Sequence, residues 1–129
     1  MQDRPTFDEL LAAIEHFLDE QTTAGAQGAR SFHARVAANA LRIVRRELER
    51  EDEALEREWE GLDALLGASE RPARRRALRE ALVTRNEALC ARIRAGDAGG
   101  GPFRTAVLSH VRETVREKLL VSNPRWLGE

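Results

Sequence analysis

Five polar or charged side chains are candidates for binding chemistry, because most of them fall where helical periodicity expects an apolar residue. These residues are His33, Arg35, Asn39, Asn86 and Lys118. An imidazole titrates near neutral pH, an Asn amide donates and accepts hydrogen bonds, and an ammonium can hold an anionic group. We predict that they line a pocket between the helices expected over residues 29–50, 72–95 and 103–122, where Lys118 meets an acyl or phosphate-bearing ligand.

The same inward-facing positions allow two other interpretations. Polar groups inside a helical bundle can form a satisfied hydrogen-bond network that determines the register of the helices. Alternatively, His33 can act as the general base of an enzyme while Lys118 holds an anion. The sequence leaves the ligand pocket, the internal network and the enzyme open.

The sequence contains no established catalytic or metal-binding motif. The glycine run at residues 99–101 has the composition of a linker, whereas a phosphate-binding loop opens a helix after a strand. Cys90 is the only cysteine, which excludes an internal disulfide, and we expect it to be a small buried thiol. We therefore predict no catalytic residue, no metal and no cofactor, which favours a protein that is not an enzyme.

The elements that would position these residues are all helices. Apolar periodicity predicts helices over residues 7–20, 29–50, 52–66, 72–95 and 103–122, of which the second and third could be continuous. No strand pattern competes with them. We predict an all-α fold, a single-domain helical bundle of four to five antiparallel helices over residues 1–129, with a Gly-rich loop at 97–102 and a C-terminal tail at 123–129.

Each predicted helix carries an apolar row that we expect to face the core, and Trp126 in the tail is expected to dock on the bundle. The helix boundaries are marked by the possible N-cap Thr6, by Gly67 and Gly96 after two helix ends, and by Pro124. The expected core rows are Phe7, Leu10, Leu11, Ile14, Phe17, Leu18; Phe32, Val36, Ala40, Ile43; Leu55, Trp59, Leu62, Leu66; Leu78, Leu82, Leu89, Ile93; and Leu108, Val111, Val115, Leu119.

Charge is segregated along the chain although the formal net charge is only −1. Residues 47–60 hold eight acidic residues and two Arg, a net charge of −6, and residues 71–94 hold eight Arg and two Glu, a net charge of +6. Antiparallel packing would pair these segments within one chain. The same charges could instead pair between two copies, or the Arg cluster could bind an anionic partner; its members are Arg71, Arg74, Arg75, Arg76 and Arg79.

The near-neutral charge, the lack of aromatic residues among the Arg cluster and the lack of a long apolar segment argue against nucleic-acid and membrane partners. The chain opens with polar residues and shows no signal peptide, so we expect a cytoplasmic protein.

The run Phe-His-x-Arg-Val-Ala-Ala-Asn-Ala-Leu at residues 32–41 resembles a motif of a bacterial family of all-α domains of unknown function. Further similar segments lie at residues 4–6, 9–11, 46–48, 92–96, 118–119 and 123–124. Genes of this family often stand beside those for aminoglycoside-phosphotransferase-like kinases and acyl-CoA dehydrogenases. The resemblance therefore implies an accessory role in acyl-CoA catabolism, and it implies no activity and no site residues.

Taken together, these features predict a non-catalytic accessory or interaction protein that supports a phosphotransferase-like kinase or an acyl-CoA dehydrogenase. A protein partner or a homodimer is expected. The alternatives are a small-ligand binding module with a pocket between helices, and an unrecognised enzyme that uses His33.

Overall fold

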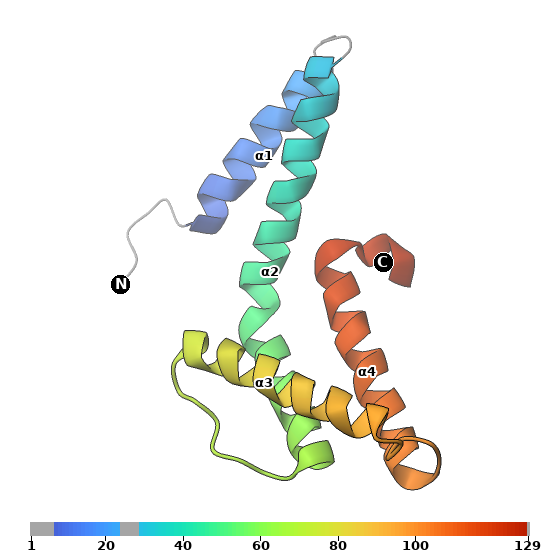
Figure 1. The fold of residues 1–129 in the computed structure, drawn as a ribbon. Coiled ribbons are helices and arrows are strands. Elements are labelled where there is room, and N and C mark those ends of the chain that lie inside the picture. The colour runs from blue at the N-terminus through green and yellow to red at the C-terminus, as the bar shows by residue number, and fades with distance from the viewer. Residues whose placement is uncertain (1–6, 24–28, 129) are drawn as a thin grey trace. The chain divides into compact units, whose positions relative to one another are not determined.

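The computed structural model describes residues 7–23 and 29–128, and these residues form helices and turns without any strand (Figure 1). The elements in chain order are α1 (Phe7–Thr23), α2 (Ala29–Leu66), α3 (Arg75–Arg94), α4 (Gly101–Ser122) and the 3-10 helix η1 (Pro124–Leu127). The prediction of an all-α fold is confirmed. No helix within the described part of the chain is both long and apolar enough to cross a membrane.

Helix boundaries follow the sequence prediction to within about one turn. α1 extends to Thr23, and α4 begins at Gly101, inside the Gly-rich loop expected over residues 97–102. The segments expected over 29–50 and 52–66 form one continuous helix, α2, because no helix-breaking residue interrupts their junction. α3 begins at Arg75 and not at Pro72, since residues 67–74 first span the distance from the end of α2. The expected N-cap Thr6 lies outside the described residues.

The chain divides into two compact units, Met1–Glu49 and Arg50–Glu129, and the boundary lies within α2. Unit 1 is a helical hairpin in which α1 runs antiparallel to the N-terminal part of α2 (Figure 1). Unit 2 contains the C-terminal part of α2 together with α3, α4 and η1. The single domain expected over residues 1–129 stays a prediction, since each unit is described by itself.

The hydrophobic core of unit 2 joins its three α-helices around Leu62, whose exposed fraction is 0%. Most of the core positions expected on the C-terminal part of α2 and on α3 are confirmed, because both helices turn Leu-rich rows toward each other. Leu55 and Leu66 are only partly buried, and the expected burial of Ile93 is wrong, since this side chain is 39% exposed. α4 adds a single buried side chain to this cluster. The buried members are Trp59, Leu62, Leu65, Leu78, Leu82, Leu89 and Val107.

The C-terminus of α2 is held by two arginines from α3 that lie two helical turns apart. Arg85 Nη2 donates a hydrogen bond to the Gly67 carbonyl at 3.0 Å, and its guanidinium lies 4.6 Å from the centre of the Trp59 ring. Arg92 Nη1 donates to the Leu65 carbonyl at 2.9 Å. Carbonyls at a helix C-terminus lack intrahelical partners and carry negative partial charge, so cations at this position stabilise the helix end. The φ of Gly67 is +95°, which fits the left-handed turn predicted after this helix.

The predicted pairing of the acidic and basic segments within one chain is confirmed in unit 2. Arg71 Nη1 lies 2.6 Å from Glu56 Oε1, and Arg75 Nη2 lies 2.9 Å from Asp52 Oδ1. Arg79 pairs with a carboxylate of the same part of α2. Exposed pairs of this kind each contribute about 0–1 kcal/mol, so their main effect is to select how α3 lies on α2.

The two helices do not pack antiparallel as expected, because contacts along α3 advance along α2 in the same chain direction. Arg75 meets Asp52, Asn86 meets Glu58 and Arg92 meets the Leu65 carbonyl.

α4 buries a different face from the one that its apolar row predicts. Leu108, Val111 and Val115 are 44%, 43% and 48% exposed. The buried and half-buried positions near the core are Phe103, Val107, His110 and others about one turn apart on a neighbouring face. The expected docking of Trp126 is also wrong, since this side chain is 75% exposed.

Replacing Leu62 with Ala tests the position of the core. We expect the free energy of unfolding to fall by about 3 kcal/mol, because a fully buried Leu loses its transfer energy and leaves a cavity. Val83→Ala is the matched control: Val83 is 60% exposed, so the change should stay within about 0.5 kcal/mol. Urea denaturation followed by circular dichroism measures both. Equal losses for the two variants would contradict the assigned core.

Candidate functional site

Three of the predicted site residues lie on the exposed side of α2 in unit 1. His33, Arg35 and Asn39 are all exposed, so the prediction that His33 and Asn39 point inward is wrong. The side of this helix that faces α1 includes Ala38, which is fully buried, and Arg42, which pairs with acidic residues of α1. The half-buried positions of the hairpin therefore mix charged residues with only some of the expected apolar ones, such as Leu11, Leu18 and Ile43. The His33 ring lies edge-on to the ring of Phe32, at 5.7 Å between ring centres.

The other two predicted site residues belong to unit 2. Asn86 is half-buried, and its Nδ2 donates to Glu58 Oε1 at 2.7 Å and to the Leu82 carbonyl at 2.9 Å. These bonds agree with the interpretation of Asn86 as part of an internal network between α2 and α3. Lys118 is exposed on α4, so its expected inward position is wrong. The predicted pocket draws on both units and stays a prediction, as does the use of His33 in an enzyme.

The structure reveals a half-buried histidine, His110, which is not among the five predicted site residues. His110 of α4 lies directly against the backbone of α2 at Gly61: a Cβ atom at that position would lie 2.3 Å from His110 Nδ1. Any side chain larger than hydrogen would therefore push the two helices apart. A glycine inside a long helix lowers helix stability, so Gly61 was the available signal for a close helix approach.

Burial determines the protonation of this histidine. Desolvation lowers the pKa of His110 from its ordinary value of 6.5, and the nearby carboxylate of Glu58 opposes this effect. Because Glu58 also accepts the hydrogen bond from Asn86, one residue from each of α2, α3 and α4 forms a polar cluster beside the core. The cluster consists of Glu58, Asn86 and His110, and its contacts link the helices of unit 2.

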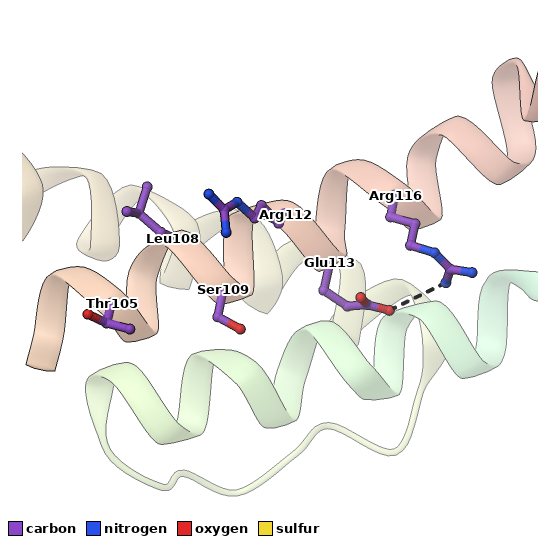
Figure 2. A pocket seen from close by; sticks show the side chains of 6 residues that line it. All are labelled: Thr105, Leu108, Ser109, Arg112, Glu113 and Arg116. Carbon is purple, nitrogen blue, oxygen red and sulfur yellow. Dashed lines mark ion pairs between the residues drawn. The ribbon is translucent and has the colours of Figure 1, made fainter. Parts of the chain in front are cut away.

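The outer side of α4 presents a row of apolar residues that the core of unit 2 does not use. We call Leu108, Val111 and Val115 the α4 apolar stripe; each is more than two-fifths exposed. Beside the stripe runs a shallow groove of about 430 Å³, whose lining comes from α4 alone. Figure 2 shows its six side chains, with Glu113 and Arg116 forming an ion pair at 3.8 Å. The lining residues are Thr105, Leu108, Ser109, Arg112, Glu113 and Arg116.

The arginine cluster considered as an anion site is largely engaged within unit 2. Arg71, Arg75 and Arg79 bind carboxylates of α2, and Arg76 pairs with Glu80 on its own helix. An anionic partner would have to displace these internal pairs, which favours the internal role of the cluster.

The remaining candidates for chemistry are the thiol of Cys90 and groups of side chains that could bind a metal ion. Cys90 is exposed, so the expectation of a buried thiol is wrong: its helix turns Leu89 to the core instead. Over residues 7–23 and 29–128, no three side chains of His, Cys, Asp or Glu come together in a group that could hold a metal ion.

Comparison with protein families gives one match, to a domain of unknown function, DUF6285, over residues 24–126. The chain belongs to this family. The match includes α2, α3 and α4, whereas α1 precedes it. No curated protein and no solved structure shows a significant similarity to the chain. The family therefore agrees with the resemblance seen in the sequence and adds no activity.

Substituting Gly61 tests the close approach in this DUF6285 protein. A Gly→Ala change inside a helix ordinarily raises stability by about 0.5–1 kcal/mol. Here we expect Gly61→Ala to lower the free energy of unfolding by about 1–3 kcal/mol, because the new methyl group overlaps the His110 ring. Urea denaturation measures the change.

Two further variants serve as controls for this test. Gly100→Ala places its methyl group in open space and should be nearly neutral. The double variant Gly61→Ala with His110→Ala should recover the ordinary gain of the Gly→Ala step, since the clash is gone. A destabilisation by Gly61→Ala that persists in the His110→Ala background would contradict the contact.

The lowered pKa of His110 predicts a pH dependence of stability. Between the two pKa values the unfolded chain holds the proton and the folded chain does not, so protonation favours unfolding. The contribution of the neutral imidazole is therefore present above pH 6.5 and is lost as the pH falls below that value toward the folded pKa. Unfolding by urea from pH 7.5 down to pH 5.5 should show a steeper loss for the natural protein than for His110→Gln. Parallel curves would contradict the assignment.

Proposed function

We propose that this protein is a non-catalytic accessory protein that binds a partner enzyme through the α4 apolar stripe. The carrying observation is the exposure of Leu108, Val111 and Val115, at 44%, 43% and 48%. These positions are spaced i, i+3 and i+7, so they share one face of a helix. The core of unit 2 is built without them.

The chemistry of this surface suits a protein partner. Single exposed apolar residues are common, but a row along one helix face is the pattern by which helices enter apolar grooves of other proteins. Arg112, Glu113 and Arg116 border the stripe and supply a charged rim. An apolar centre with a polar rim is the usual composition of a protein–protein interface.

The class of partner comes from the family resemblance. The resemblance implies that genes of this family stand beside genes for aminoglycoside-phosphotransferase-like kinases and acyl-CoA dehydrogenases. These enzymes are therefore the proposed partners. A role in support of acyl-CoA catabolism follows from that setting. In this role the protein would change the conformation or the stability of the partner enzyme.

Binding of the full-length protein to a purified neighbouring kinase or dehydrogenase tests the proposal. We expect co-elution from a size-exclusion column, and isothermal titration calorimetry should show that Val111→Glu weakens binding by about tenfold or more, because a charge replaces a central apolar contact. Val83→Glu is the matched control, since it places the same charge on an exposed valine of α3, which is 60% exposed against 43% for Val111. Separate elution of both enzymes from this protein at high concentration would overturn the proposal, as would equal effects of the two variants.

A further inference from the structure

α4 carries a positively charged side chain at each end of the α4 apolar stripe. Arg104 lies four residues before Leu108, and Lys118 lies three residues after Val115. Residues separated by three, four or seven positions share one face of a helix. Both cations are exposed, so together with the stripe they form one continuous row along the outer side of α4.

Two further arginines flank this row on one side. Arg112 follows Leu108 by four positions, and Arg116 follows Arg112 by four positions. Both line the groove beside the stripe (Figure 2). When two helices pack lengthwise, charged side chains beside the apolar seam form the ion pairs that select the partner. The two arginines are therefore placed to meet carboxylates of a helix that lies on the stripe.

The two acidic residues of α4 point away from this row. Glu117 has a side chain that is 12% exposed, and its Oε1 lies 3.1 Å from Arg57 Nη2, so this carboxylate belongs to the contact between α2 and α4. Glu113 lies two positions after Val111, and residues two positions apart point to different sides of a helix. The charge that α4 places around the stripe is therefore positive.

These four cations have few anionic partners within the protein. In the part of the chain that the structure describes, Arg112 and Lys118 form no ion pair. Arg104 donates a hydrogen bond of 3.4 Å to a backbone carbonyl of the loop before α4. Arg116 lies 3.8 Å and 3.9 Å from the two carboxylates of α4, farther than the ~2.7–2.9 Å of a charge-assisted hydrogen bond. Their charge is therefore available to a partner, unlike that of the α3 arginines that bind carboxylates of α2.

We infer that the partner lays an acidic amphipathic helix on the α4 apolar stripe. The inference rests on the proposed function and names the chemistry that the partner presents to this surface. Leu108, Val111 and Val115 alternate spacings of three and four residues, which is the seam by which two helices pack lengthwise. The row from Arg104 to Lys118 extends over about 21 Å, because each residue advances a helix by about 1.5 Å. The partner helix then offers apolar residues at the same spacing, with Asp or Glu beside them.

Charge complementarity selects an acidic helix over a neutral or basic one. A neutral helix on the stripe would remove water from Arg112 and Lys118 without supplying a hydrogen-bonding anion, which costs free energy. A basic helix would add repulsion between like charges. An acidic helix covers the apolar residues and pairs the cations in one contact, and such complementary charges also exclude partners of the wrong sign.

The composition of this face favours a protein helix over a nucleic acid or a lipid surface. A nucleic acid would pair its phosphates with the cations, but the stripe offers no ring on which a base could stack. A helix that lies on an anionic membrane usually inserts a wide apolar face that contains Trp, Phe or Leu. The stripe is narrow and consists of one Leu and two Val, which suits the seam of a second helix.

Isothermal titration calorimetry of the full-length protein against two synthetic helical peptides tests the inference. Both peptides carry Leu at alternating spacings of three and four, and they differ only in the flanking positions, which hold Glu in one and Lys in the other. We expect the Glu peptide to bind about tenfold more tightly or better, because the Lys peptide is repelled by the four cations. Added salt should weaken the Glu peptide, since attraction between exposed charges is screened.

The double variant Arg112→Gln with Lys118→Gln locates the charge that the Glu peptide recognises. We expect it to weaken this peptide by about tenfold and to leave the melting temperature unchanged, because neither cation forms an ion pair within the described part of the chain. Arg74→Gln with Arg94→Gln is the matched control. It also removes two exposed arginines without a carboxylate partner among the described residues, but these belong to α3 and the residue before it, so binding should be unchanged.

Several results would overturn the acidic helix. Equal affinity for the two peptides, or no binding of either, excludes selection of the partner by acidic charge, and both comparisons need only the natural protein. Equal effects of the two double variants would also contradict the assigned cations. Phosphatidylserine vesicles and a double-stranded DNA of mixed sequence are the probes for other anionic surfaces: binding of one of them without binding of the Glu peptide assigns the face to that surface instead.

The same variants separate this inference from the proposed function. A neighbouring kinase or dehydrogenase that binds and is weakened by Val111→Glu, but not by Arg112→Gln with Lys118→Gln, supports the proposed function and overturns the acidic helix. If the Glu peptide binds as expected while neither enzyme does, the chemistry inferred for the partner is supported and the proposed enzymes are removed.

Discussion

The burial of Leu62 between three helices is the constraint on which unit 2 depends. To bury this side chain, the C-terminal part of α2 must stay helical to Leu66 and meet the Leu row of α3. The helix end that results leaves unpaired carbonyls beside the core. Arg85 and Arg92 of α3 bind these carbonyls, so the residues that stabilise the end of α2 also attach α3 to it.

Electrostatics adds selectivity to this apolar contact. The pairs of Arg71 with Glu56 and of Arg75 with Asp52 are exposed, and each contributes little free energy. Their main contribution is to the position of α3 on α2, because a shift of α3 along α2 would separate these arginines from their carboxylate partners. The close approach of His110 to Gly61 restricts α4 in a similar way, by shape and not by charge.

Both units leave apolar surface uncovered, although they do so for different reasons. In unit 2, α4 turns Val107 and His110 toward α2, which leaves the α4 apolar stripe outside. In unit 1, ion pairs such as Arg42 with Glu15 take part in the contact between α1 and α2, and apolar residues such as Phe17 and Phe32 are left exposed. Such uncovered apolar surface supports the proposed interaction role.

The sequence by itself determined the all-α class, the helix boundaries near Gly67 and Asn123, and the segregation of acidic and basic segments, whereas the structure decided that these segments pair within one chain. These properties follow from local periodicity, helix-ending residues and local charge, which neighbouring residues encode directly. Only the tertiary structure decided which side of each helix is buried. His33 and Lys118 are exposed, whereas His110 is half-buried. The side of a helix that is buried depends on the surface of the adjoining helix as well as on its own apolar row. His110 can approach α2 because Gly61 has no side chain at the point of contact.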